Sequence, residues 1–297
     1  MSPLSARQVQ STLRKYGITP SKRRGQSFLT DSGIARRIVK AAKLGPTDSV
    51  LEIGGGLGIL TKPIAEEAGK VYVVEIDPLL VTALQDAMAG TPNVQIIHGD
   101  ALRVPLPMAN KCVSNLPYSI SSDMTFRLWN ELDLDMAVLM YQREYAQRLL
   151  AEPGSSEYSR LTVDINYRAT VEKVMHVPAT MFYPVPAVDS VVVKMTPRVQ
   201  GSFAEDRSLF LQMVNGIYPY PNKHLRRALG IWLENLGLSK DLSEAAILRM
   251  RKKLTGEEKL RCLPLEDLIA LADSLLGMIN DGILPDIRRK TSERLGP

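Results

Sequence analysis

The sequence is poor in cysteine and contains no long hydrophobic run. Only two cysteines occur among 297 residues, and no pair has CxxC spacing, so neither a disulfide framework nor a cysteine-based zinc site is expected. The most apolar runs, such as residues 136–140, are far shorter than the roughly 20 residues of a membrane-spanning helix. The first ten residues lack the apolar stretch of a secretory signal. These absences predict a cytoplasmic protein that does not enter a membrane.

Histidine is also scarce, and the composition is otherwise that of a globular protein. The three histidines, at positions 98, 176 and 224, show no ligand spacing, so no metal is expected. Hydrophobic residues make up 45% and charged residues 23% of the chain, which is close to the globular average. At roughly 100–200 residues per domain, the length predicts one large domain, or a large domain with a small one.

The charge is unevenly distributed. The net charge is +5, from 37 basic and 32 acidic residues. Residues 1–50 carry ten basic against two acidic side chains, and residues 222–253 carry eight against three. Two interpretations are open: two solvated faces, or a surface that binds a polyanion.

Short apolar segments alternate with helical patterns along the first two thirds of the chain. The segments that predict strands are 49–54, 70–76, 94–100, 111–118, 135–142 and 188–195, and helical spacing occurs at 61–69, 78–90 and 121–132. This alternation predicts βαβ units and a parallel sheet with helices on both faces. After Pro197 only helical periodicity remains. We therefore predict an α/β domain over 1–200 and a small helical domain over 201–297.

A glycine-rich loop follows the first predicted strand. Residues 54–58 read GGGLG and give GxGxG spacing. The dinucleotide fingerprint needs a third glycine at 59 or 61, where isoleucine and threonine stand. The loop therefore predicts a ligand that approaches the backbone closely without a pyrophosphate.

Acidic residues end the next two strands. Glu75 lies 21 positions after Gly54, and Asp100 ends the third strand. A carboxylate at the first of these positions accepts hydrogen bonds from ribose hydroxyls, and one at the second can accept from an adenine amino group. The alternative is that each acid only forms a turn. Taken with the loop, the two acids predict S-adenosylmethionine as the cofactor.

The fourth strand ends in Asn-Leu-Pro-Tyr, residues 115–118. The Asn115 oxygen and a neighbouring carbonyl can accept the two N–H bonds of a base amino group and orient its lone pair. Pro117 restricts Leu116 to extended geometry, which aims that carbonyl. The Tyr118 ring offers a face on which the base can stack. The motif predicts methyl transfer to an amino group, with an inconsequential turn as the alternative.

The chain resembles the ribosomal RNA adenine N6,N6-dimethyltransferases of the small subunit, the KsgA type, and most of all their archaeal branch. The motifs that carry the resemblance are GQSFL (25–29), LEIGGGLGILT (51–61), VEID (74–77), GDAL (99–102), NLPY (115–118) and FYPVPAVDSVVV (182–193). It implies a Rossmann-like class I methyltransferase sheet, with helices on both faces, followed by a small all-helical C-terminal domain. It also implies dimethylation of two adjacent adenosines in a 3′-terminal hairpin loop of small-subunit rRNA, late in subunit biogenesis.

The resemblance also implies roles for individual residues. The cofactor would contact Ser27, Leu29, Gly54, Gly56, Glu75, Asp100, Ala101 and Asn115. The catalytic set would be Asn115, Leu116, Pro117, Tyr118 and Phe182. Phe182 would stack on the target adenine opposite Tyr118, with core packing as the alternative.

The partners implied are small-subunit rRNA and the precursor of the small ribosomal subunit. The residues that would grip the RNA are Lys22, Arg23, Arg24, Lys223, Arg226 and Arg227. The last three have the i, i+3, i+4 spacing of one helix face. Arg226 or Arg227 could instead only pair with Glu234 or another acid.

Three competing hypotheses remain. One is a methyltransferase acting on large-subunit rRNA, whose members usually lack the long basic helical tail seen here. Another is a nicotinamide-dependent oxidoreductase, which the missing third glycine and NLPY disfavour. The third is a non-catalytic RNA-binding assembly factor, which the intact NLPY motif and cofactor acids disfavour.

Overall fold

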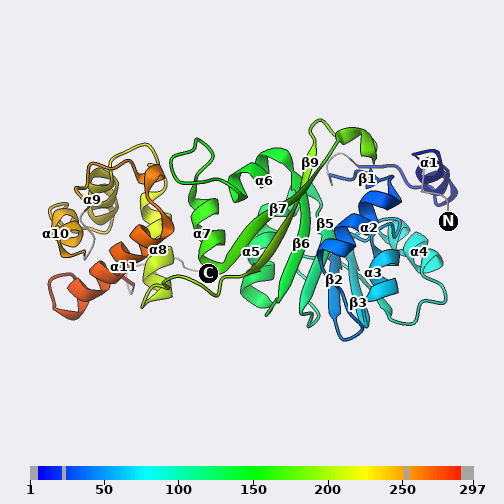
Figure 1. Cartoon of the computed structure of the whole chain (residues 1–297), viewed down its shortest axis with the longest axis horizontal. Helices are drawn as coiled ribbons and strands as arrows, with labels where there is room; N and C mark the ends of the chain where they lie inside the picture. Colours follow the sequence, from blue (N-terminus) through cyan, green and yellow to red (C-terminus); the bar gives the residue numbers. More distant parts are fainter. Residues whose placement is uncertain (1–5, 22–24, 251–253, 289–297) are drawn as a thin grey trace. The chain divides into compact units, whose positions relative to one another are not determined.

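The computed structural model describes residues 6–21, 25–250 and 254–288, and the chain divides into two compact units (Figure 1). The sheet unit comprises Met1–Ala146 and Ala169–Pro197, and the helical unit comprises Gln147–Arg168 and Arg198–Pro297. The chain thus leaves the sheet unit close to the predicted boundary. It differs from the prediction in placing residues 147–168 with the C-terminal helices.

A seven-stranded sheet in the order β4-β3-β2-β5-β6-β9-β7 forms the centre of the sheet unit. The strands are β2 (Ser49–Ile53), β3 (Lys70–Glu75), β4 (Val94–His98), β5 (Lys111–Asn115), β6 (Met136–Gln142), β7 (Ala169–Val177) and β9 (Ser190–Pro197). The first five strands of this order are parallel, as predicted. The segment 188–195 was predicted as a strand without a direction, and the structure shows β9 running antiparallel to β6 and β7. Residues 178–189, which contain η2 and β8, connect β7 to β9, and the two strands pair from Val177 opposite Ser190 to Ala169 opposite Pro197.

Helices cover both faces of this sheet, as predicted. Those of the sheet unit are α1 (Ala6–Lys15), α2 (Ser32–Ala41), α3 (Thr61–Glu67), α4 (Pro78–Ala87), the short η1 (Tyr118–Ile120), α5 (Ser121–Glu131) and α6 (Arg143–Leu149), which ends across the unit boundary. On one face, Ile38 of α2 and Ile64 of α3 pack with Val138 of β6. On the other face, Thr125 of α5 shares a 2.7 Å hydrogen bond with the Tyr141 hydroxyl of β6.

A two-stranded antiparallel sheet joins distant parts of the sheet unit. It pairs β1 (Phe28–Leu29) with β8 (Phe182–Tyr183), and Leu29 lies opposite Phe182. The short η2 (Ala179–Met181) precedes β8. This pairing brings the GQSFL segment next to the FYPVP segment.

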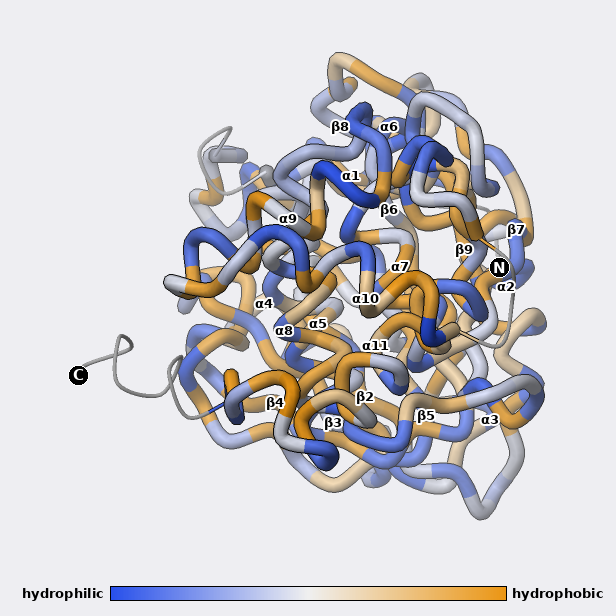
Figure 2. Tube along the Cα trace, turned by 90° about the vertical axis from the view of Figure 1, so that its left-hand side faces the viewer, coloured by the Kyte–Doolittle hydropathy of each residue, from blue (hydrophilic) through white to orange (hydrophobic). Residues whose placement is uncertain are grey.

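The helical unit has its own hydrophobic core. Its helices are α7 (Arg160–Arg168), α8 (Arg207–Ile217), α9 (Leu225–Asn235), α10 (Leu242–Arg249), η3 (Leu260–Cys262) and α11 (Leu265–Asn280). The Tyr167 ring of α7 stacks on Phe210 of α8 with centroids 4.3 Å apart, which is why residues 147–168 belong with this unit. The alternation of hydrophobic and hydrophilic residues along these helices can be followed in Figure 2.

Gly216 generates a test of this core. A Cβ at this position in α8 would lie 2.0 Å from Trp232 of α9, whereas a Cβ at Gly230 would meet nothing closer than 3.4 Å. Alanine is about 1 kcal/mol better than glycine inside a helix, but overpacking costs about 1–3 kcal/mol. We expect Gly216→Ala to lower the free energy of unfolding and Gly230→Ala to leave it unchanged or raise it. Urea denaturation followed by tryptophan fluorescence measures both; equal stability of the two variants would contradict the packing described.

Candidate functional site

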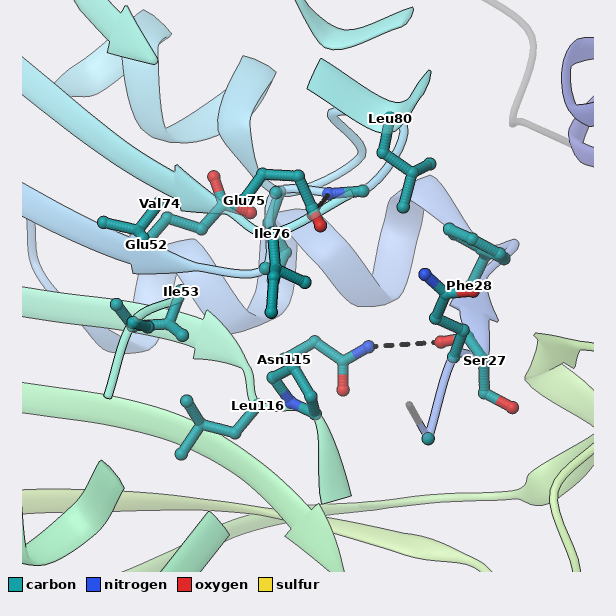
Figure 3. A pocket seen from close by; sticks show the side chains of 18 of the residues that line it. Ser27, Phe28, Glu52, Ile53, Val74, Glu75, Ile76, Leu80, Asn115 and Leu116 are labelled. Carbon is teal, nitrogen blue, oxygen red and sulfur yellow. Dashed lines mark hydrogen bonds between the residues drawn. The ribbon is translucent and has the colours of Figure 1, made fainter. Parts of the chain in front are cut away.

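A cavity lies at the carboxyl ends of the parallel strands (Figure 3). Its walls come from Val9 and from the segments 25–29, 52–57, 59–60, 74–76, 80, 99–101 and 115–120. The strand order changes direction where β2 and β5 lie side by side, and ligands of open α/β sheets bind outside such a switch point. The structure therefore brings five of the six sequence motifs to one cavity.

The glycine loop lies directly against the NLPY segment. Gly54, Gly56 and Gly58 have φ angles of +76°, +55° and +81°, a region that favours glycine. A Cβ on Gly54 would lie 3.2 Å from Cγ of Pro117. Gly54 and Pro117 both line the cavity. A side chain on Gly54 would press on the Pro117 ring, whereas glycine leaves the backbone of the loop accessible from the cavity.

Glu75 presents a buried carboxylate to the cavity (Figure 3). The residue is 4% exposed, and its two oxygens accept 3.0 Å hydrogen bonds from the backbone N–H groups of Gly56 and Asp77. Burial raises the pKa of this carboxyl group. Since a carboxylate has about four acceptor sites, the two bonds hold Glu75 in place and leave acceptors for a ligand.

Asp100 and Ala101 lie in the turn after β4, and this turn is held from outside. Asp100 accepts a 2.9 Å hydrogen bond from the Leu102 N–H. Arg127 of α5 donates to the carbonyl of Ala101 and, over 2.9 Å, to that of Val104. Asp100 and Ala101 both line the cavity. Arg127 is therefore a positioning residue for this wall.

Sequence reasoning missed Arg127, although one signal was present. Glu131 lies four residues further along α5 and accepts two hydrogen bonds from the guanidinium, of 2.8 and 2.9 Å. An i, i+4 pair of this kind is common on exposed helices. The contacts of Arg127 with the turn after β4 could not be predicted, because they depend on the tertiary structure.

Asn115 ends β5 with its amide oriented by the GQSFL segment (Figure 3). Its Nδ2 donates over 3.5 Å to the carbonyl of Ser27. Because a carbonyl only accepts, the amide nitrogen faces Ser27. Oδ1 is buried and has no hydrogen-bond partner among the residues that the structure describes. Such an acceptor is costly to leave unpaired, so it indicates a missing donor from a ligand.

The rest of the NLPY segment lies where the motif predicts. Pro117 has φ −56° and follows the buried Leu116. The Tyr118 hydroxyl shares a 2.7 Å hydrogen bond with Ser190 of β9, and burial raises its pKa. Leu116, Pro117 and Tyr118 line the same cavity as Asn115.

Ser27 and Leu29 also line the cavity, but Phe182 does not. The Ser27 hydroxyl donates to the carbonyl of Pro184 over 2.8 Å, so this residue ties the N-terminal segment to the chain after β8. Phe182 is 2% exposed and packs in the core with Leu29 and Met175. The expected stacking role of Phe182 is contradicted, because pairing with β1 turns its side chain into the core. The alternative of core packing holds.

Glu52 lines the cavity but was not singled out from the sequence. The residue is 1% exposed and accepts a 2.6 Å hydrogen bond from the Thr61 hydroxyl. Burial raises the pKa of its carboxyl group to about 8. The hydrogen bond to Thr61 connects β2 to the start of α3 beneath the glycine loop.

Of the six basic residues expected to contact RNA, three can be placed. Lys22, Arg23 and Arg24 lie outside the described residues. Lys223, Arg226 and Arg227 line a second cavity, on the helical unit. Lys223 precedes α9 rather than sharing its face, because the helix begins at Leu225.

The neighbouring arginines Arg226 and Arg227 have different surroundings. Arg226 donates over 2.7 Å to the carbonyl of Thr255 and lies 3.5 Å from Glu257. The alternative of an acid partner therefore holds for Arg226, with Glu257 instead of Glu234. Within the part of the chain that the structure describes, Arg227 forms no ion pair. Of the two arginines, Arg227 is therefore the one without an acid partner among the described residues.

No group of three or more His, Cys, Asp or Glu side chains is arranged to hold a metal ion in residues 6–21, 25–250 and 254–288. None of the described helices has both the length and the apolar character needed to cross a membrane.

The strand order, the glycine loop, the buried Glu75 and the unpaired Asn115 oxygen together define an S-adenosylmethionine-dependent methyltransferase of class I architecture. The particular family follows from comparison with known proteins. The chain belongs to the ribosomal RNA adenine dimethylase family, whose model matches residues 19–269. The predicted family, fold class and cofactor are confirmed.

Individual relatives agree with this membership. A Methanosarcina mazei protein named "Probable ribosomal RNA small subunit methyltransferase A" is 47% identical over 74% of this chain and 81% of its own length. A protein of the same name from Methanopyrus kandleri is 39% identical over 89% of this chain and 96% of its own. Two crystal structures are similar: a Plasmodium falciparum dimethyladenosine transferase (TM-score 0.74, 29% identity, 86% of this chain and 98% of its own) and the 23S rRNA methyltransferase ErmE (0.65, 28%, 84% and 99%).

The Arg127 clamp generates a prediction about cofactor binding. Arg127→Met removes two charged donors from the turn that carries Asp100 and Ala101. Hydrogen bonds to charged groups contribute about 1.5–3 kcal/mol, so we expect affinity for S-adenosylhomocysteine to fall at least about tenfold. Calorimetric titration of the full chain is the measurement.

Arg103→Met is the matched control. Arg103 lies in the same turn and 3.5 Å from Asp100, but its side chain is 86% exposed, and exposed ion pairs contribute little. We expect its affinity to stay within about twofold of the parent. If both arginine variants behave alike, the clamp has no special role.

Proposed function

We propose that this chain transfers methyl groups from S-adenosylmethionine to the N6 amino groups of two adjacent adenosines in small-subunit rRNA. The observation that carries this proposal is the buried Asn115 Oδ1, an acceptor without a partner among the described residues at the end of β5. An acceptor so placed suits an amino group, which brings N–H donors into the cavity. Family membership and the archaeal relatives support the RNA substrate.

The residues of the cavity fit the cofactor. The backbone of the glycine loop is accessible at Gly54 and Gly56, and the oriented Glu75 carboxylate suits a pair of ribose hydroxyls. Asp100 and Ala101 lie at the neighbouring strand end, where a carboxylate and a backbone N–H suit adenine. The bound cofactor supplies an electrophilic methyl group.

The remaining residues would act by orienting the target base. Ser27 holds the Asn115 amide so that Oδ1 can accept one N–H of the amino group. The Leu116 carbonyl, held in extended geometry by Pro117, would accept the other. The Tyr118 hydroxyl is neutral at pH 7, burial raises its pKa further, and its ring can stack on the base. Catalysis would then rest on proximity and preorganised acceptors, with no strong general base.

The RNA itself would be recognised mainly through phosphate contacts. We infer that the target lies in a 3′-terminal hairpin loop of small-subunit rRNA, presented by a precursor small subunit in the cytoplasm. A second candidate is large-subunit rRNA, favoured by the likeness to ErmE. Transfer of labelled methyl groups to under-methylated small subunits, large subunits and the separated rRNAs, followed by nucleoside analysis, decides between them. Dimethyladenosine in small-subunit rRNA alone is expected.

Removal of the Asn115 acceptor tests the proposed chemistry. Asn115→Ala leaves one N–H of the target unpaired, and loss of one preorganised contact of this kind typically lowers the rate about 10²–10³-fold. We expect that loss in single-turnover methylation at saturating cofactor and RNA. RNA affinity serves as the control and should change little, while saturating cofactor removes any effect of the substitution on cofactor binding. A variant that binds both and methylates at the parent rate would remove the basis of the proposal.

Arg226 and Arg227 form a matched pair for RNA binding. Each phosphate contact contributes roughly one unit to the slope of log affinity against log salt. We expect Arg227→Ala to reduce this slope by about one. Arg226→Ala should change the slope much less, because Arg226 is engaged with Thr255 and Glu257. Filter binding of small-subunit rRNA over a salt series measures both slopes. An unchanged slope for Arg227→Ala would show that Arg227 is a solvated surface residue that contacts no phosphate.

A further inference from the structure

Helix α1 has only a narrow apolar face, and that face is fully used. In the sequence ARQVQSTLRK, Val9 and Leu13 are 2% and 3% exposed, while most other side chains are exposed. The spacing of four places both residues on one side of the helix. The helix precedes residue 19, where the match to the family begins. The family match therefore gives no role to α1, although its Val9 and Leu13 side chains are buried.

The buried face of α1 packs on α4 and β1. Val9 and Leu13 form one cluster with Phe28 of β1 and with Leu80 and Ala83 of α4. The end of the helix is fastened by a 2.7 Å hydrogen bond from the Tyr16 hydroxyl to Asp86 of α4. The helix is thus docked along the same element that follows Glu75 in the chain.

Val9 also lines the cavity itself. Two residues of the α1 cluster, Phe28 and Leu80, line it as well. Figure 3 shows Leu80 and Phe28 together on the side of the cavity toward which the Glu75 carboxyl group points. This side of the cavity is therefore lined by residues from three elements: α1, β1 and α4.

We propose that α1 is part of the cofactor-binding site and forms the apolar wall next to Glu75. This inference rests on the proposed function and specifies which part of the chain completes its cofactor site. An apolar wall keeps water from the carboxylate, and hydrogen bonds to a charged acceptor are stronger where water is excluded. The packing of α1 against α4 and β1 therefore raises the affinity of the site for the ligand that Glu75 binds.

A charge on the buried face of α1 tests this role. Val9→Asp places a carboxylate in the apolar cluster, and we expect affinity of the full chain for S-adenosylhomocysteine, measured by calorimetry without RNA, to fall at least about tenfold. Ser11→Asp is the matched control, since it introduces the same residue at an exposed position of the same helix. Its affinity should stay within about twofold of the parent. Parent-like affinity of Val9→Asp would overturn the proposal.

A milder variant keeps the test decisive if Val9→Asp is misfolded. Leu13→Ala loosens the same cluster without altering an atom that lines the cavity, and we expect a threefold to tenfold loss of affinity. Both variants should raise the KM for the cofactor and leave kcat at saturating cofactor unchanged. Circular dichroism without cofactor must show each variant fully folded at the assay temperature, because a partly unfolded chain would also raise the apparent KM. Unchanged affinity and KM in Leu13→Ala would also overturn the proposal.

The same experiments separate this inference from the proposed function. A parent chain that fails to bind S-adenosylhomocysteine would refute the cofactor site as a whole, and the role of α1 with it. A parent chain that binds the cofactor and methylates small-subunit rRNA, while the α1 variants bind as tightly as the parent, would refute only the role of α1.

Discussion

The close approach of Gly54 to Pro117 is the contact on which the rest of the site depends. It exists because β2 and β5 are parallel neighbours, so that the loop after one strand meets the segment after the other. A side chain at position 54 would press on Pro117 and displace either the loop or the NLPY segment. The glycine loop and the NLPY segment therefore meet where the Gly54 backbone lies against the Pro117 ring, and the φ angle of +76° at Gly54 favours glycine there.

Each functional group of the cavity is oriented by a neighbour from a distant segment. Glu75 is held by N–H groups of Gly56 and Asp77, and Asn115 by the carbonyl of Ser27. Arg127 holds the turn that carries Asp100. Arrangements of this kind keep donors and acceptors in place before a ligand arrives, so less reorganisation is needed when it binds. The site thus consists of short motifs and of the groups that keep them oriented.

Much of the fold and of the cavity follows from local patterns. The strands β2 to β6, the helices between them and the helical end of the chain agree with the periodicity, because each buries a face within one short segment. The motifs with the expected cofactor and acceptor residues line one cavity, since parallel strands place their carboxyl ends at one edge. Strand β7 was not predicted; only three of its nine residues are buried, and a register shift between Lys173 and Met175 interrupts the alternation that would have marked it as a strand.

The sequence by itself determined the family, the cofactor and the five motifs that line the cavity, because these are contiguous segments. Tertiary structure alone decided the direction of β9, the burial of Phe182 and the assignment of residues 147–168 to the helical unit. It also distinguished Arg226, which is tied to Thr255, from its neighbour Arg227. Each of these outcomes depends on contacts between residues far apart in the chain. The sequence does not reveal such contacts, because the type of one side chain does not specify which distant residue will pack against it.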